Sequence, residues 1–306
     1  MKRIAILAGM VLLLVCGCAQ KGLERRAAVL GRHVPDVERL ERSKGFLTEE
    51  YYAMLEEMVG LPDYAPVLHE WEFWFVAADG SPVAACAGKV DSLVKLDDAH
   101  AEAVMLVQPA DSDYVAERHK LLMEKVEGKW LLADYDDTRE ACARYLESRR
   151  REQVERDAIG EYLVKEIGKH YLQGEVCIPV IRIVSEEEVS EAESRVWGDF
   201  WVDWYKVAGD TLKTVSGGNH SGCMTLRRQG DAVSVAGFEQ TVDGAGNEPS
   251  ARRIFGNHFD IYQAIHSNDD SRQQARKAAI RAYRDSHDLA VKFFQDYGWP
   301  AEPVDE

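Results

Sequence analysis

This chain has too few basic residues to balance its acidic ones. Its 306 residues include 37 Lys and Arg against 53 Asp and Glu, which gives a formal net charge of −16. A surface of this sign repels the phosphates on which nucleic-acid binding depends, and it disfavours adsorption to anionic lipid. We therefore expect no nucleic-acid partner.

Motifs for metal, phosphate and covalent chemistry are also missing. The six cysteines form no CxxC pair of the kind that binds zinc, and the glycine-rich stretch at 244–247 lacks the P-loop pattern GxxxxGK[ST]. We expect no metal and no cofactor. No strong catalytic motif stands in their place, so an enzyme is the less favoured class.

Long apolar runs are absent except at the start of the chain. Lys2 and Arg3 precede the apolar stretch 4–15, and small residues follow it. The stretch is shorter than the roughly 20 residues that span a bilayer, and this order is typical of a secretory signal. Gly17 before Cys18 resembles the bacterial lipoprotein cleavage box, with Cys18 as the acylated first residue of the mature protein.

That resemblance implies a cellular location. Residues 1–17 are the expected signal peptide, and the lipid bilayer is the expected partner of acylated Cys18, because two or more acyl chains anchor stably. Ala19, rather than Asp, follows the cysteine. In the familiar sorting rule this implies delivery to the outer membrane. We expect a lipid-anchored protein of the bacterial cell envelope that faces the periplasm.

The remaining chain is long enough for two domains. Residues 18–45, partly helical and interrupted by Gly31 and Pro35, are interpreted as a solvated tether. Thr48 is a good N-cap for a helix that begins the first domain, 46–137. A charged stretch at 148–157 inside a long helical pattern marks the connection to the second domain, 138–306.

Each domain shows a helical pattern followed by alternating strand patterns. In the first domain a helix at 49–59 precedes strands at 71–75, 83–94, 101–107, 121–126 and 129–135. In the second a helix at 159–172 precedes strands at 177–184, 196–207, 211–215, 223–228 and 232–240. Two further helices are expected, one from 270 and one over 286–297. Gly298 is expected to form the C-terminal cap of the second helix, with Trp299 as the apolar partner of that cap.

A helix followed by an antiparallel meander resembles the nuclear transport factor 2-like (SnoaL-like) superfamily, over 46–136 and 157–242. The resemblance implies an α+β fold, with two tandem cones of one helix and a curved antiparallel sheet, and a C-terminal helical extension. The segments Trp201 to Met224 and Phe238 to Gly246 are also similar to lipoproteins of gut bacteria, a likeness that brings no activity with it.

An aromatic strand in the second domain offers the first candidate site. The two-residue period places Trp197, Trp201, Asp203 and Tyr205 on one face, with Phe200, Val202 and Trp204 on the other. Aromatic walls suit sugars and other flat ligands, although packing against a helix explains them as well. Burial would raise the pKa of Asp203, which fits either an acid–base role or a structural hydrogen bond.

The segment 216–223, SGGNHSGC, offers the second candidate. Its paired glycines allow close approach of a backbone or ligand, and Asn219 and His220 add polar groups. We favour a hairpin or bulge held by structural hydrogen bonds. Ligand binding is the alternative, and a His220–Cys223 nucleophile pair is a remote one, because residues three apart on a strand face opposite sides.

Four cysteines remain after Cys16 and Cys18: Cys86, Cys142, Cys177 and Cys223. Four cysteines allow three disulfide pairings, among which sequence does not decide. Cys177 with Cys223 is the pairing we favour if one forms, and buried free thiols are an equal alternative.

Three functions stay open. We favour a non-catalytic module that binds a small molecule, a glycan or an envelope protein through Trp197, Trp201, Asp203, Tyr205, Asn219 and His220. The second possibility is a SnoaL-like isomerase, dehydratase or hydrolase in which Asp203 and His220 are the catalytic candidates. The third is a structural scaffold whose cones are filled by side chains.

Overall fold

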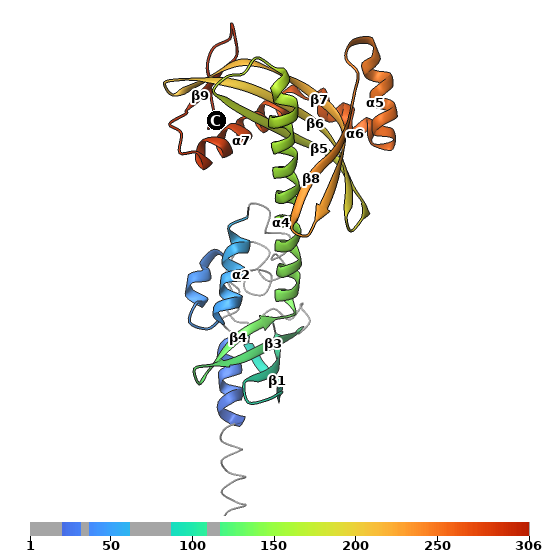
Figure 1. The fold of residues 1–306 in the computed structure, drawn as a ribbon. Helices are drawn as coiled ribbons and strands as arrows, with labels where there is room; N and C mark the ends of the chain where they lie inside the picture. Colours follow the sequence, from blue (N-terminus) through green and yellow to red (C-terminus); the bar gives the residue numbers. More distant parts are fainter. Residues whose placement is uncertain (1–19, 32–36, 62–86, 109–116, 306) are drawn as a thin grey trace, which may run out of the picture. The chain divides into compact units, whose positions relative to one another are not determined.

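The structure, a computed structural model, describes residues 20–31, 37–61, 87–108 and 117–305. It divides into two compact units between Arg149 and Arg150, inside the charged stretch of the long helix (Figure 1). The predicted signal peptide with Cys18, the strand pattern at 71–75 and Cys86 lie outside the described residues. No helix in the described part is both long and apolar enough to cross a membrane.

The first unit is built on a four-stranded antiparallel sheet in chain order: β1 (Ala87–Lys95), β2 (His100–Gln108), β3 (Glu117–Val126) and β4 (Lys129–Tyr135). A 3-10 helix, η1 (Val37–Ser43), leads to α2 (Glu49–Val59). Thr48 accepts a hydrogen bond from the backbone N–H of Tyr51, which confirms the predicted N-cap. Tyr51 and Leu55 on one face of α2 are buried in the core of this unit.

Residues 20–30 form a helix that belongs to the first unit. Leu23, Ala27 and Leu30 recur at helical spacing and are buried in its core. Arg26 Nε donates to the backbone oxygen of Trp130 at 2.7 Å. The prediction of a solvated tether is therefore wrong for this segment, because its apolar stripe packs against the sheet.

The long helical pattern forms α4 (Thr138–Tyr162), which continues as a π-helical turn, η2 (Leu163–Ile167), and a 3-10 turn, η3 (Gly168–His170). Ile159, Leu163 and Ile167 lie four residues apart, so they share one face of the helix. All three are buried against the sheet of the second unit.

The second unit contains a mixed sheet. β5 (Val176–Ser190), β6 (Glu193–Ala208), β7 (Thr211–Gln229) and β8 (Ala232–Gln240) form an antiparallel meander, and β6 and β7 curve along their length (Figure 1). β9 (Phe293–Gln295) pairs in parallel with the start of β7, and β10 (Glu302–Pro303) pairs with β9.

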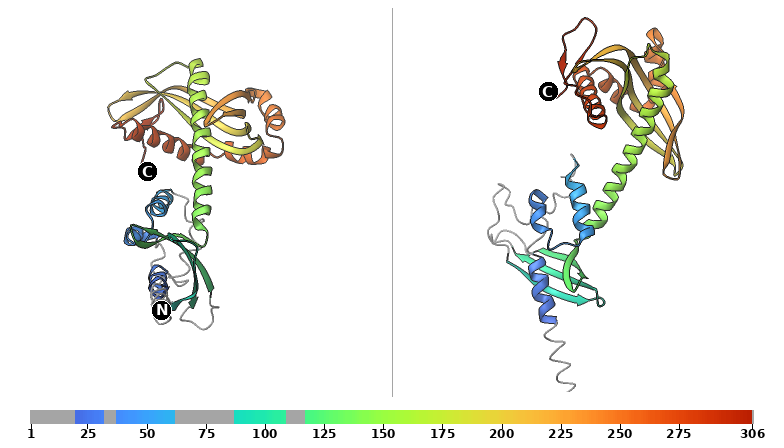
Figure 2. Two further views of the ribbon diagram at one scale, coloured as in Figure 1. Left: turned by 60° about the horizontal axis from the view of Figure 1, so that its bottom comes forward. Right: turned by 60° about the vertical axis from the view of Figure 1, so that its left-hand side comes forward.

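Helices cover the two faces of this sheet. The second half of α4 crosses one face (Figure 2), where Phe200 and Val202 pack against Ile159 and Leu163. The opposite face carries α5 (Asn247–Phe255) and α6 (Phe259–His266) at one end and α7 (Asp269–Ser286) at the other. The two-residue period predicted for the aromatic strand is confirmed, because Trp197 and Tyr205 are buried on this opposite face.

The predicted second C-terminal helix over 286–297 is wrong. The chain leaves α7 and becomes extended, and Phe294 pairs with Leu212 in the parallel ladder, where its side chain is buried. Gly298 has the positive φ expected of it, +80°, but in a turn rather than a helix cap. Trp299 is exposed and does not pack as an apolar partner. The fold class is thus α+β, as expected, with less helix at the C-terminus.

Candidate functional site

A polar stripe crosses the face of the second sheet that carries α5, α6 and α7. It lies between two apolar clusters, one around Trp197 and Phe255, the other around Tyr205 and Ile280. The stripe contains two charged centres, one at Asp199 and one at Arg276. Buried charges need partners to remain ionised, so the partners of each centre decide what it can do.

Asp199 of β6 is fully buried. Five side chains hydrogen-bond to its two oxygens at 2.6–3.2 Å. They are Arg182 Nη1 and Trp201 Nε1 on Oδ2, and Asn219 Nδ2, Ser221 Oγ and His266 Nδ1 on Oδ1. Burial alone would raise the pKa of Asp199, but the hydrogen bonds from His266, Ser221 and Asn219 outweigh it and hold the pKa at about 2.

This first centre is a closed network. Five donors leave the carboxylate little capacity for a ligand. Ser221 donates to Asp199 rather than to His266, so the three residues do not have the order of a nucleophile triad. Arg182 also donates to the backbone oxygen of Ile265 at the end of α6. The centre therefore attaches α6 to the sheet.

The second centre surrounds Arg276 of α7, which is buried. Its guanidinium makes a bidentate pair with Asp296, at 2.8 and 2.7 Å, and donates to Thr214 Oγ1 and the Tyr205 hydroxyl at 2.8 and 2.9 Å. A planar fork of this kind suits arginine and not lysine. The network joins α7 to β6, β7 and the segment after β9.

Asp203 lies beside this network and joins it through a side-chain hydrogen bond with Tyr205, not through a close contact with Arg276. Its Oδ2 is 3.6 Å from Arg276 Nε, beyond normal hydrogen-bond length, although the side chain is largely buried. Burial raises the pKa of Asp203 above its ordinary value, against the lowering effect of Arg276 and together with the raising effect of Asp296. This is the direction that its position among aromatic residues predicted.

Trp201 and Asp203 line one cavity of about 150 Å³. The other residues that line it are Val180, Arg272, Gln273, Arg276 and Asp296. The Arg272 guanidinium lies over the Trp201 ring, 4.7 Å from its centroid. Gln273 brings a buried Oε1 that has no hydrogen-bond partner. The cavity thus combines one aromatic wall, two arginines, two carboxylates and an unpaired acceptor.

The predicted binding residues do not all meet in this cavity. Trp197 lines a separate open hollow, Tyr205 is fully buried, and Asn219 donates to Asp199. His220 points to the opposite face of the sheet, where Nε2 bonds the Tyr171 hydroxyl at 2.9 Å. A site that unites Asp203 with His220 is therefore not formed.

The segment 216–223 is neither a hairpin nor a loop. It lies in β7, in register with β6 from Ser216 to Cys223, so the expected hairpin is wrong. A register shift lies at its edge, between Thr214 and Ser216, and Asn219 and Ser221 make structural hydrogen bonds to Asp199, as expected. The paired glycines admit side chains rather than a ligand: a Cβ on Gly218 would lie 2.2 Å from the Tyr171 hydroxyl.

The thiols do not supply the chemistry considered for them. Cys142, Cys177 and Cys223 are free, so the Cys177–Cys223 disulfide is not formed and the alternative of free thiols is correct for these three residues. Burial raises the pKa of each thiol to about 11, which suppresses the reactive thiolate. In the part of the chain that the structure describes, no group of three His, Cys, Asp or Glu residues could hold a metal ion.

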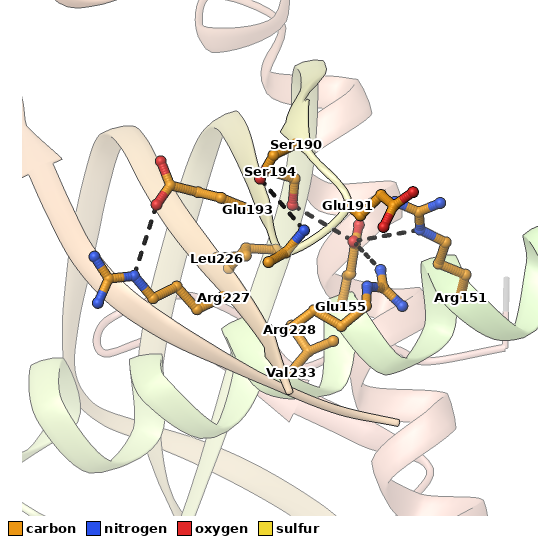
Figure 3. A pocket seen from close by; sticks show the side chains of 11 residues that line it. Arg151, Glu155, Ser190, Glu191, Glu193, Ser194, Leu226, Arg227, Arg228 and Val233 are labelled. Atoms are coloured by element: carbon orange, nitrogen blue, oxygen red, sulfur yellow. Dashed lines mark hydrogen bonds and ion pairs between the residues drawn. The ribbon is translucent and has the colours of Figure 1, made fainter. Parts of the chain in front are cut away.

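Two other hollows in the second unit are less suited to a small ligand. One, between α4 and the β5–β6 turn, has room of only about 10 Å³, enough for about one water (Figure 3). Its centre is Glu155, paired with Arg228 at 2.8 Å. The other, about 610 Å³ beside Trp197 and α5, is an open surface depression.

Sequence reasoning missed most of the charged partners. Arg182, His266 and Arg276 come from β5, α6 and α7, Asp296 follows β9, and no local spacing connects the four. Asp199 could have been found, because it lies on the same two-residue period as Trp197, Trp201 and Asp203.

Fold and site together define an α+β protein with a buried polar stripe and a small charged cavity. No protein-family model matches the chain, and no curated protein matches it. Among solved structures it is similar to an "Ntf2 like protein involved in plasmid conjugation", at 10% identity over 73% of this chain and 98% of that chain, with a TM-score of 0.22. A superposition at this level carries no argument about function.

Proposed function

We propose that the chain is a non-catalytic binding module whose second unit takes a small polar molecule in the cavity beside Trp201. The observation that carries this proposal is the cavity of about 150 Å³ with its mixed lining of aromatic, cationic and anionic side chains. At about 10–15 Å³ for each water it has room for about ten waters. That room suits a monosaccharide or an amino acid rather than a polymer.

The same cavity is less suited to catalysis than to binding. General acid–base chemistry needs a second group within hydrogen-bond reach of the reacting atoms. Asp203 has no histidine partner there, since His220 lies on the other face. Asp199 is saturated by five donors, and the thiols are held protonated.

We further propose that the module is carried on the bacterial cell envelope by acylated Cys18, with the outer membrane as its site and the periplasm as its compartment. The cleavage-box pattern at 16–18 and Ala19 support this. Two tandem units of the nuclear transport factor 2-like kind are proposed on the order of elements, a helix followed by an antiparallel meander, in each unit.

A ligand screen tests the binding role. The full chain is heated with a panel of monosaccharides, amino acids and polyols, and the midpoint of unfolding is measured. A molecule that binds only the folded state stabilises it by about 2.7 kcal/mol at a hundredfold excess over Kd. We expect at least one class to raise the midpoint in the parent chain but not in Trp201→Ala. A ligand that stabilises both proteins equally would place binding elsewhere.

A further inference from the structure

The charges around the Trp201 cavity are balanced but unevenly satisfied. Two carboxylates, Asp203 and Asp296, and two guanidinium groups, Arg272 and Arg276, line it. Arg276 makes four hydrogen bonds, two of them to Asp296, so these two residues satisfy each other. The groups left to interact with a guest are Asp203, Gln273 and Arg272.

Two of these groups are acceptors with room for a further donor. Asp203 accepts a side-chain hydrogen bond from Tyr205, but its Oδ2 is 3.6 Å from Arg276 Nε, and Gln273 Oε1 is buried without a hydrogen-bond partner. A buried acceptor without a donor destabilises the empty cavity, and a ligand that donates a hydrogen bond to it removes that cost. An ammonium group offers three donors and no acceptor, so it complements this part of the cavity.

The third group is a partly exposed donor, Arg272. The Arg272 side chain is about one-third exposed, and its ion pair is with Asp269, a residue that is itself largely exposed, at 3.3 Å. Exposed ion pairs of this kind contribute little to stability. Arg272 can therefore exchange Asp269 for a carboxylate on a guest at small cost. The Trp201 ring beneath its guanidinium holds the fork in place.

From this arrangement we propose that the cavity binds a zwitterionic α-amino acid. Its ammonium group donates to Asp203 and Gln273 Oε1, and its carboxylate accepts from Arg272. This inference rests on the proposed binding function and names the class of ligand. A ligand with only a carboxylate would leave Asp203 and Gln273 without a donor, and one with only an ammonium group would leave Arg272 without an acceptor. A zwitterion supplies both groups and leaves the net charge of the cavity unchanged.

The test compares L-alanine with two analogues that each lack one of its charges. N-acetyl-L-alanine lacks the ammonium group, and L-alaninamide lacks the carboxylate. Binding to the full chain is followed by NMR through the indole N–H signals of its seven tryptophans. The Trp201 signal is identified by its loss in Trp201→Phe. We expect alanine to shift this signal with a Kd about tenfold or more below that of either analogue, the difference expected for one charged hydrogen bond.

Two variants separate the two ends of the ligand. Asp203→Asn should weaken alanine binding to the level of N-acetyl-alanine and leave N-acetyl-alanine unchanged. Arg272→Gln should weaken alanine to the level of alaninamide and leave alaninamide unchanged. The matched controls are the exposed changes Asp231→Asn and Arg253→Gln. Because Asp203→Asn can perturb folding, Gln273→Met provides a second loss of the acceptor end, and circular dichroism checks each variant.

Glucose is the uncharged probe that separates the two proposals. Equal affinity for alanine and its analogues, or binding of glucose with no binding of alanine, overturns the zwitterion inference and leaves the binding function standing. If no probe of the wider ligand panel moves the Trp201 signal, both proposals fail. Loss of alanine binding in the Asp231 or Arg253 control also overturns the assignment of the site.

Discussion

Gly217 of β7 lies directly opposite Asp203 of β6, and a Cβ on Gly217 would lie 2.2 Å from Asp203 Oδ1. The missing side chain at one position thus makes the space for the carboxylate at the other. The glycine pair that suggested a turn in the sequence instead shapes the lining of the Trp201 cavity.

The first prediction follows from that contact. Gly217→Ala should displace Asp203 and destabilise the second unit by about 1–3 kcal/mol, the usual cost of overpacking. Gly237→Ala on β8 is the matched control, because no atom lies within 4 Å of the Cβ it would add. We expect that control to be neutral or slightly stabilising. Denaturant unfolding measures both, and equal effects would contradict the role of the contact.

The second prediction concerns acid stability. The pKa of Asp199 is about 2 in the folded protein, below its ordinary value of 3.8. Since the folded-state pKa is the lower one, this stabilisation is present above the unfolded-state pKa and is lost as the pH falls through about 2. The shift corresponds to about 2 kcal/mol.

Asp199→Asn removes this pH dependence. We expect the free energy of unfolding of the parent chain to fall by about 2 kcal/mol more than that of the variant between about pH 5 and about pH 2. At neutral pH the variant should be weaker by about 3–5 kcal/mol, because buried Arg182 loses its carboxylate. Parallel pH curves for the two proteins would show that the five-donor network does not stabilise the ionised form.

The elements with clear local signals were predictable. The strands at 129–135 and 232–240 have the bounds the sequence indicated, since each follows a turn glycine and alternates regularly. Thr48 caps its helix as expected. The faces of β6 followed from the two-residue period alone, which is why Trp201 and Asp203 were placed together correctly.

The remaining features depended on contacts between distant segments. Residues 289–297 carry apolar residues at helical spacing, but the start of β7 recruits Phe294 into a parallel ladder. The apolar stripe of 20–30 reads as part of a tether until a sheet packs against it. Arg276 lies near Asp203 only because α7 packs on the sheet. Its second carboxylate partner, Asp296, comes from the segment after β9, and no local pattern in the sequence indicates that pairing.

The third prediction concerns Cys18, which lies outside the described residues. If it is acylated, the protein produced in a bacterial host that processes lipoproteins should partition into the detergent phase, and Cys18→Ser should remain in the aqueous phase. Intact mass measures the acyl chains directly. Cys16→Ser is the control, and it should keep the anchor. Detergent partitioning of Cys18→Ser would rule out the anchor at this position.

The last prediction distinguishes the binding wall from the core by comparing two tryptophans of β6. Trp197 is buried, and its Nε1 donates to the backbone oxygen of Ile254 at 2.8 Å. Trp197→Ala should therefore cost about 3–5 kcal/mol of stability. Trp201 is only partly buried and faces the cavity, so Trp201→Ala should cost less than Trp197→Ala and abolish ligand binding. If Trp201→Ala proves the more destabilising of the two, its ring serves the core, and the cavity is a packing defect rather than a binding site.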